Sequence, residues 1–564
     1  MDADRLRRAW NEFFAGKQHV LLPSASLIPT HPTAPMFTNS GMMQFVPYFL
    51  GEEAVPWSPA RVATVQRCVR AGGKHNDLDA IGRTPRHLSF FEMLGNFSFG
   101  DYFKAEAIPW AWELLTEVLG LEPDRMWVTV HVSDDEAAEI WTDAVGFPAE
   151  RIQRLDKDNF WEMGDTGPCG PSSEIFWDYG PDFGPDGGPA EPAAQDRYVE
   201  IWNLVFPQYF RQASGELTDL PRRGIDTGAG LERMLTAING THVVYDVDPL
   251  DRLVQTAQSL TGRRLGVDDR TDVALKVLAD HARTMTFLVA DGVIPSNEDR
   301  GYVLRRITRR AVRYAYLLGT EREVTPTLVG AVVEVMGDAY PELVEGADRI
   351  TGILAREEDR FRQTLKRGTT LLDAKLADLT EGATLPGEVA FDLYETYGFP
   401  LEVTQEITAE LGIDVDEDGY RAALGRAQDR SKAGTREADL YRDLSSFQGV
   451  LDSFGPTEFT GRGEDETKAT VLAVIPEGDD ALAVFLDRTP FYAESGGQVG
   501  DTGTITTDTG RLEVLDTTYG LPGLHRHRAQ LVEGTVEAGQ AATAAIDVER
   551  RSAIRRNHTG THIL

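Results

Sequence analysis

Short apolar runs separated by glycine turns characterise the first part of the chain. Residues 127–132 and 198–206 are two such runs, and both are rich in β-branched and aromatic side chains. Apolar runs of this length, bounded by turn-forming residues, are typical of strands. With helix-compatible segments between them, they predict a mixed sheet flanked by helices over residues 1–245.

The pattern becomes helical over residues 246–452. Apolar positions such as Leu278, Ala282 and Met285 recur at three- and four-residue spacing, with long charged faces between them. Because few aromatic strands interrupt this spacing, we predict an all-helical domain.

A third pattern covers residues 453–548. Residues 468–474 and 481–486 are short alternating runs in a segment rich in Thr, Val and Gly, which is typical of a small β-barrel or sandwich. Residues 549–564 then begin a basic, helix-compatible segment that stops without a C-terminal cap. We therefore expect the chain to be a fragment that stops inside a further domain.

Composition and charge narrow the class of protein. The 564 residues are enough for three or four domains, and no apolar run approaches the roughly 20 residues of a membrane span. The first ten residues lack the apolar core of a secretory signal, so we expect a cytoplasmic enzyme. A formal net charge of -34 argues against a general nucleic-acid binder, since phosphate binding needs Lys and Arg surfaces. Any RNA contact must therefore be a local basic patch.

Cys68 and Cys169 are the two cysteines of the chain. Two cysteines cannot build a disulfide framework, and these two do not have the spacing of metal ligands. We expect both to be structural.

The segment GIDTGAGLER, residues 224–233, is a candidate ligand-binding segment. Its glycines allow a ligand to approach the backbone closely, Asp226 supplies a carboxylate, and Arg233 lies in the helix-compatible part that follows. Taken alone, the same pattern is equally typical of a tight turn with a helix cap.

A second candidate combines RCVRAGGKHND, residues 67–77, with RHLSFFEMLGNFSFGD, residues 86–101. We predict a strand carrying Arg70, a Gly-Gly turn with Lys74, and a second strand with paired aromatic residues. Two antiparallel strands joined by a basic loop offer a guanidinium to phosphate oxygens and an aromatic face to a base. The alternatives are a nucleotide site without a Walker loop and a basic hairpin with core aromatics.

Residues 301–319 predict an amphipathic, arginine-rich helix. Apolar residues spaced 3-4-3-4 define one face of this helix: Leu304, Ile307, Ala311, Tyr314 and Leu318. We expect the arginines on the opposite face: Arg305, Arg306, Arg309, Arg310 and Arg313. Like charges at i, i+4 destabilise an isolated helix, which favours contact with a phosphate backbone over a solvated or internally paired face.

Five segments together resemble the alanyl-tRNA synthetase family of class II aminoacyl-tRNA synthetases. FTNSGMMQFVPYFLG (residues 37–51), the two-stranded segment of residues 67–101 and GIDTGAGLER are similar to class II motifs 1, 2 and 3. WEMGDTGPCGPSSEI (residues 161–175) and EIWNLVFPQY (residues 200–209) resemble segments specific to the alanyl family. The resemblance runs to the last residue. It implies a multidomain α+β protein: an antiparallel-sheet catalytic domain, an all-helical tRNA-binding domain, a small β-barrel and the start of an α/β editing domain.

The resemblance implies an enzyme that activates L-alanine with ATP and Mg²⁺ and transfers it to the acceptor stem of tRNA(Ala). Arg70 then holds the ATP α-phosphate and the alanine carboxylate, and Lys74 lies in the adjoining loop. Phe91 lies under the adenine ring, and Arg233 lies on its other side or on the γ-phosphate.

The resemblance also implies an alanine pocket, in which Gly228 serves the ATP site as well: Trp161, Asn203, Val205, Asp226 and Gly228. Asp226 pairs with the substrate ammonium group in this interpretation. Trp161 and Val205 limit the space for a side chain.

Two further segments resemble parts of the family that contact the acceptor stem. In PSNEDRGY, residues 295–302, Asn297 matches the residue that reads the wobble pair. In LYETYGFP, residues 393–400, Glu395 stands where the family usually has Asp.

A proofreading site is expected on energetic grounds. One methyl group is worth only about 1–3 kcal/mol, so a pocket for alanine admits glycine, and serine is also poorly rejected. Residues 489–503 and NHTGTH, residues 557–562, resemble the start of the alanyl editing domain. His558 and His562 have the i, i+4 spacing that suits Zn²⁺, although surface histidines are the alternative. Zinc needs about four ligands and the family's remaining ones would follow Leu564, so we expect weak or absent zinc binding and no deacylase activity in this chain.

Other functions account for less of the chain. A small-molecule ligase or amide synthetase would use the first domain alone, and an RNA-binding relative without catalysis would have no need of Arg70 and Arg233. A stand-alone deacylase would need the rest of the zinc site. The oligomeric state stays open, with a homodimer through a region beyond Leu564 as one option.

Overall fold

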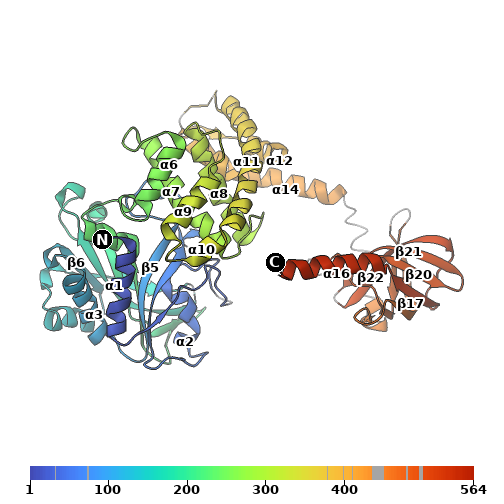
Figure 1. Cartoon of the computed structure of the whole chain (residues 1–564), viewed down its shortest axis with the longest axis horizontal. Coiled ribbons are helices and arrows are strands. Elements are labelled where there is room, and N and C mark those ends of the chain that lie inside the picture. The colour runs from blue at the N-terminus through green and yellow to red at the C-terminus, as the bar shows by residue number, and fades with distance from the viewer. Residues whose placement is uncertain are drawn as a thin grey trace. The chain divides into compact units, whose positions relative to one another are not determined.

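The fold is described from a computed structural model (Figure 1). The structure describes residues 1–31, 34–72, 75–164, 166–377, 379–380, 382–397, 399, 401–409, 411–434, 447, 450–451, 453–477, 481–494, 499–521 and 523–563. The chain divides into two units, which are described separately below. The first unit contains Met1–Leu385 and Asp392–Val415, and the second contains Pro386–Phe391 and Asp416–Leu564.

An 11-stranded sheet forms the framework of the first unit. Its main path runs in the order β1 (Val20–Leu22), β2 (Arg61–Val69), β5 (Phe90–Phe99), β13 (Gly224–Gly230), β10 (Tyr198–Val205), β9 (Gly167–Asp178), β11 (Tyr209–Arg211) and β12 (Leu217–Asp219). Three further strands pair off this path: β6 (Met126–His131), β7 (Ile152–Leu155) and β8 (Phe160–Glu162). Among the described residues of this sheet, only the β1–β2 and β6–β7 strand pairs are parallel, and the other pairs are antiparallel. The predicted antiparallel sheet is therefore confirmed.

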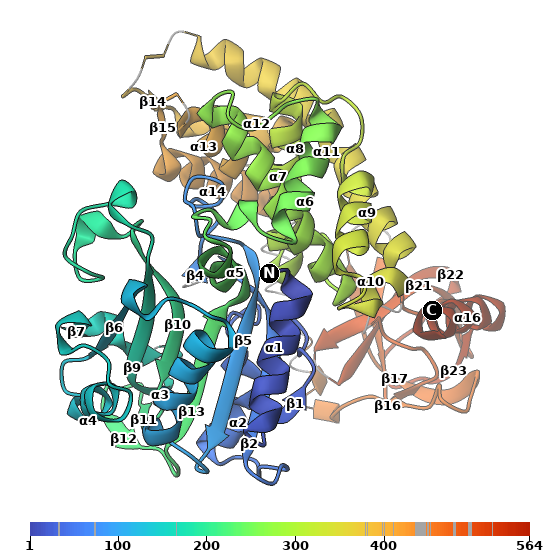
Figure 2. The ribbon, with the colours of Figure 1, turned by 60° about the vertical axis from the view of Figure 1, so that its left-hand side comes forward.

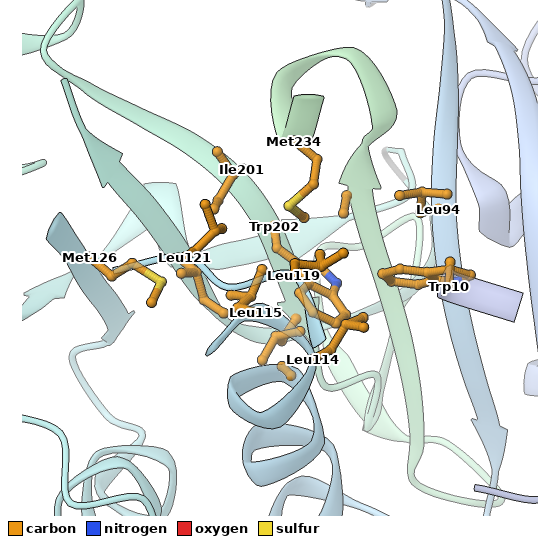
Figure 3. Packing of buried hydrophobic residues seen from close by; sticks show 14 of the residues in the cluster. Trp10, Leu94, Leu114, Leu115, Leu119, Leu121, Met126, Ile201, Trp202 and Met234 are labelled. Atoms are coloured by element: carbon orange, nitrogen blue, oxygen red, sulfur yellow. The ribbon is translucent and has the colours of Figure 1, made fainter. Parts of the chain in front are cut away.

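One face of this sheet is covered by a hydrophobic core. Helices α1 (Ala3–Gly16) and α3 (Lys104–Glu113) pack there against alternate strand residues such as Leu94 and Trp202. Trp202 lies against Trp10 of α1, with ring centroids 4.9 Å apart (Figure 3). Burying one such aromatic side chain removes roughly 200 Å² from water, which stabilises the fold by about 5 kcal/mol. The opposite face of the central strands is left for the site described below.

A group of helices follows the strands of the sheet in the first unit (Figure 2). They are α5 (Leu231–Asn239), α6 (Leu250–Thr261), α7 (Asp269–Ala290), α8 (Asp299–Leu317), α9 (Thr325–Met336), α10 (Pro341–Glu345), α11 (Ala347–Leu376) and α13 (Leu401–Ala409). Helix α7 packs against both α6 and α8. The predicted helical region is confirmed, with one short parallel pair that the pattern did not predict, β14 (Thr384–Leu385) with β15 (Asp414–Val415). None of the described helices combines the length and the apolar character needed to cross a bilayer.

A closed barrel dominates the second unit. Its strands follow the order β17 (Glu466–Glu477), β18 (Ala481–Leu486), β22 (Leu524–Gly534), β21 (Gly510–Leu521), β20 (Gly503–Thr507) and β23 (Ala541–Ile546). Inward-facing residues such as Val471, Val484 and Leu512 fill its core. The predicted β-barrel is confirmed. Helices α14 (Glu417–Gly434) and α16 (Val548–Ile563) belong to the same unit, and the division between the units falls within α12 (Gly387–Tyr397).

Both cysteines are buried and free of disulfides. Cys68 lies on β2 and Cys169 on β9. Burial raises the pKa of Cys169 to about 11, so it remains a thiol at neutral pH.

Candidate functional site

A hollow of about 100 Å³ lies in the first unit. Its walls come from β5, β10 and β13, from the first turn of α5 and from the segments next to β2 and β5. Four predicted ATP-binding residues line it together: Arg70, Phe91, Gly228 and Arg233. The sequence motifs therefore converge on one site, although residues 70 and 233 are far apart in the chain.

Strand register explains how the predicted alanine pocket forms beside this hollow. Across β10 and β13, Asn203 pairs with Gly228, and Val205 pairs with Asp226. Alternate residues of a strand share a face, so these four residues lie on the same side of the sheet. Leu204, which lies between Asn203 and Val205, belongs to the core on the other face.

Arg70 lies directly after β2, rather than inside a strand as predicted. Its backbone N–H donates to the carbonyl of Ser89 at 2.9 Å, which extends the β2–β5 pairing by one residue. Its Nε donates to the carbonyl of Asn39 at 3.3 Å, and its guanidinium carbon lies 5.0 Å from the ring centroid of Phe91. The remaining guanidinium donors are suited to phosphate oxygens.

The hairpin predicted to carry Lys74 follows Arg70. Strand β3 (Ala71–Gly72) pairs with β4 (His75–Asn76), and Asp77 N–H donates to the carbonyl of Arg70 at 3.2 Å. Lys74 itself lies outside the described residues.

Arg233 lies in the first turn of α5 and reaches back to β10. Its Nη1 is 3.3 Å from both the carbonyl oxygen and Oε2 of Glu200. Both side chains are partly exposed, and ion pairs of this kind contribute only about 0–1 kcal/mol. A phosphate could therefore replace Glu200 as the partner of Arg233 at little cost.

Asp226, on β13, is a titratable group with a strongly shifted pKa. It is 6% exposed, and burial raises its pKa to about 7. No described residue forms a hydrogen bond or an ion pair with its carboxylate. Such a group is poised to bind a cation brought by a ligand.

Asn203 presents a second unsatisfied acceptor. Its Nδ2 donates to Oε1 of Glu174 at 2.9 Å, whereas its Oδ1 is buried without a hydrogen-bond partner in the described part of the chain. Leaving a buried acceptor unpaired costs about 1–3 kcal/mol. An ammonium donor entering here would recover that energy.

Trp161 and Val205 supply apolar walls. Val205 is buried, and Trp161 packs against the cluster that contains Phe97, the strand partner of Asp226. A Cβ at Gly228 would lie 2.7 Å from Sδ of Met93, so any larger residue there would displace a lining side chain of the hollow. Trp161, Asn203, Val205 and Asp226 are not among the residues that line the hollow, although Asn203 pairs with the lining residue Gly228.

Several polar residues of the site were missed from the sequence, Asp77, Arg86 and Glu232 among them. Glu200 and His87 line the hollow, and Glu174 lies behind Asn203. Burial, then repulsion by Glu200 and Asp158, raises the pKa of Glu174 well above its usual range, and burial and Arg233 lower the pKa of His87. For Glu200 the available signal was a carboxylate inside the apolar run of residues 198–206.

The arginines of α8 do not form the single outward row that was predicted. Arg310 and Arg313 are buried, and Arg310 donates to the carbonyl of Leu78. Arg305 and Arg309 pair with Glu357 of α11, at 3.2 and 2.8 Å. Two other elements pack on α8, so its buried surface is wider than one apolar stripe.

The remaining predicted RNA-contacting residues are accessible. Asn297 is exposed and accepts a hydrogen bond from Arg305, and Arg306 is half-buried. Glu395 is exposed on α12. Contact with tRNA stays a prediction for all of them.

His558 and His562 lie on α16, but their side chains are outside the described part of the structure. Within that part, no group of three or more His, Cys, Asp or Glu residues could hold a metal ion.

Comparison with known proteins identifies the family. A family model described as tRNA synthetases class II (A) matches residues 5–550. The chain is similar to the alanine–tRNA ligases of Chromohalobacter salexigens (47% identity, 100% of this chain and 64% of the relative) and Cereibacter sphaeroides (48%, 99% and 64%). It is also similar to that of Acidithiobacillus ferridurans (46%, 100% and 65%). The chain thus spans 64–65% of the length of these relatives.

A solved structure of pyrrolysyl-tRNA synthetase from Desulfitobacterium hafniense matches with 12% identity and a TM-score of 0.25, over 44% of this chain and 73% of that one. The family match covers nearly the whole chain and includes every strand of the sheet around the hollow. This chain belongs to the class II (A) family of tRNA synthetases.

Proposed function

We propose that the chain activates L-alanine with ATP and transfers the alanyl group to the 3′ end of tRNA(Ala), as an alanine–tRNA ligase. One observation carries the proposal. Arg70 and Arg233 line one hollow together with Gly228 of β13. Two residues before Gly228 on this strand lies the buried carboxylate of Asp226, which has no partner among the described residues. The relatives named alanine–tRNA ligase support the choice of amino acid.

The proposed chemistry follows from charge. The carboxylate of alanine attacks the α-phosphorus of ATP, an oxygen–phosphorus bond forms, and pyrophosphate leaves. Negative charge grows on the phosphoryl oxygens, where the guanidinium groups of Arg70 and Arg233 stabilise it. Asp226 holds the ammonium group, so the substrate carboxylate is oriented without a protein nucleophile.

Mg²⁺ fits the donors that line the hollow. The carboxylates of Asp77 and Glu200 are oxygen ligands of the kind this ion accepts. When bound with ATP, the ion neutralises charge on the phosphates.

The proposal has further parts for the longer protein. We propose a cytoplasmic location for this activity. We also propose that His558 and His562 contribute to a zinc site for hydrolysis of mis-acylated tRNA, together with residues that follow this chain in its longer relatives.

ATP–pyrophosphate exchange measured with each of the twenty amino acids tests the proposal. We expect exchange that depends on alanine, with weaker exchange for serine and glycine. An absence of alanine-dependent exchange would refute the proposed function. Release of AMP stimulated by tRNA separates a tRNA ligase from an amide synthetase that uses the first unit alone.

Alanine activation should weaken in acid. Asp226 must be charged to hold an ammonium group, and its pKa is about 7, so protonation below pH 7 removes the partner. We expect kcat/KM for alanine to fall by up to about tenfold for each pH unit below 7, because this ratio reports the free enzyme. Exchange assays from pH 5.5 to 8.5 measure the profile, and a flat profile across this range would contradict the role of Asp226.

Asn297→Ala should separate tRNA charging from alanine activation. A side chain that reads one base pair contributes about 1–3 kcal/mol, so charging should fall roughly 10- to 100-fold. Exchange should stay at the wild-type rate, because Asn297 is exposed and is not among the residues that line the hollow. Unchanged charging in this variant would rule out its assigned role.

A further inference from the structure

Buried polar side chains of helix α7 form hydrogen bonds at the N-terminal end of β5, next to the hollow. Asp280, Arg283 and Thr284 are all fully buried on one side of this helix, at spacings i, i+3 and i+4. Each of them contacts Ser89 or Phe90, the residues just before Phe91. The contact is therefore made at the strand end that carries one wall of the site.

Asp280 is the centre of this contact. Its Oδ1 accepts the backbone N–H of Ser89 at 2.8 Å, and its Oδ2 accepts the hydroxyl of the same residue. Nδ1 of His281 donates to Oδ2 at 2.8 Å, and the Ser89 hydroxyl lies 2.7 Å from that of Thr284. One carboxylate thus fixes both the backbone and the side chain of Ser89.

Ser89 in turn holds Arg70. The carbonyl of Ser89 accepts the backbone N–H of Arg70 at 2.9 Å. Because Arg70 lies beyond the end of β2, this bond is the last that aligns it with β5. A shift of Ser89 would move Arg70 and, two residues along, Phe91.

Arg283 makes a parallel connection to the other guanidinium. Its Nη1 donates to Oε1 of Glu232 at 2.5 Å, and its Nη2 donates to the carbonyl of Phe90 at 2.9 Å. Glu232 is the neighbour of Arg233 in the first turn of α5. Helix α7 therefore contacts α5, which carries Arg233, and Ser89, which accepts the backbone N–H of Arg70.

Glu358 of α11 provides a contrasting case. It is also a fully buried carboxylate, and it accepts the backbone N–H groups of Val324 and Thr325 and the hydroxyl of Thr325. None of its partners lines the hollow. A buried carboxylate in this unit can thus contribute to stability alone. Asp280 differs because its partner Ser89 forms a hydrogen bond with Arg70, which lines the hollow.

We propose that Asp280 is a positioning residue, which sets the place of Arg70 in the hollow through Ser89. This inference rests on the proposed function, because Arg70 acts there on the α-phosphate of ATP. Asp280 touches neither substrate nor reacting atoms, and its effect is on geometry.

Asp280→Asn in the 564-residue chain tests the proposal, with Glu358→Gln as the matched control. Both variants remove one buried charge and should lower the melting temperature. Only Asp280→Asn should weaken the binding of ATP, with the Kd measured by calorimetry rising about 10-fold. The kcat of exchange should also fall about 10- to 100-fold in this variant, because a displacement of a catalytic group by about 1 Å lowers the rate on this scale. Glu358→Gln should keep both values within about twofold of wild type.

Equal ATP affinity and exchange in Asp280→Asn and Glu358→Gln would overturn the proposal. If Asp280→Asn does not fold, Ser89→Ala decides by the same two measurements, because it removes only the hydroxyl held by Asp280. We expect Ser89→Ala to raise the Kd for ATP by at least threefold, and a wild-type Kd in this variant would contradict the proposal. A wild-type chain that binds ATP without alanine-dependent exchange would refute the proposed function instead, while the ATP affinities of the variants would still test Asp280.

Discussion

Asp226→Asn should remove nearly all alanine-dependent exchange and at the same time make the folded chain more stable. Asparagine keeps the shape of the side chain but cannot pair with an ammonium group. Removing one partner of a buried charge pair costs about 3–5 kcal/mol, so kcat/KM for alanine should fall by at least 100-fold. Melting and exchange of one preparation measure both effects.

The gain in stability follows from the pKa. Burial raises the pKa of Asp226 from 3.8 to about 7, so the folded protein keeps a proton that the unfolded chain releases above pH 4. Stability therefore falls as the pH rises from 4 to 7, by roughly 4 kcal/mol at about 1.4 kcal/mol for each pH unit. Asparagine carries no such cost.

We therefore expect Asp226→Asn to unfold at higher denaturant concentration than wild type at pH 8, with a smaller difference at pH 5. Asp246→Asn is a suitable control, because burial also raises the pKa of Asp246, which lies outside β13, in the 3-10 helix Val244–Asp246. This control should leave exchange unchanged. A loss of stability at pH 8, or exchange near the wild-type rate, would show that Asp226 is not an unpaired buried carboxylate that awaits a cation.

Arg70→Ala should abolish ATP–pyrophosphate exchange in the presence of alanine. Its guanidinium is fixed by the backbone bonds around Ser89 and Asn39 and lies in the hollow before any ligand arrives. Loss of one preorganised donor to a developing charge costs about 10²–10³ in kcat, and loss of the charge adds to this. The fall should exceed 1,000-fold, on the order of 4 kcal/mol.

Two variants sharpen this test. Arg70→Lys keeps the positive charge but loses the planar pair of donors, so its exchange should lie between wild type and Arg70→Ala. Arg83→Ala removes an exposed arginine that does not line the hollow, and its exchange should stay at the wild-type rate. Exchange at the wild-type rate in Arg70→Ala would refute the assignment.

Local patterns were sufficient to predict much of the fold. The apolar runs at residues 127–132 and 198–206 correspond to β6 and β10, and the alternating runs at 468–474 and 481–486 fall in β17 and β18. A strand buried on both faces is apolar along its length, and that signal needs no knowledge of its neighbours.

The site was only partly predictable, because its supporting contacts join distant segments. The bond from Ser89 to Asp280 spans 191 residues, and that from Arg310 to Leu78 spans 232. An arginine near a distant carbonyl looks the same in sequence as one facing solvent, which is why the outward row predicted on α8 was wrong for Arg310 and Arg313. Glycine-flanked motifs located Arg70 and Arg233, whereas Glu200 and His87 became visible as lining residues only in the folded chain.

The closed barrel of the second unit bears on how the chain behaves at high concentration. Strand β23 pairs with β17 on one side and β20 on the other, so the ring of described strands is complete. Unpaired strand edges are the places where separate chains add to one another in fibrous aggregates. This ring offers none among its six strands, so crowding should not drive edge-to-edge polymerisation through the barrel.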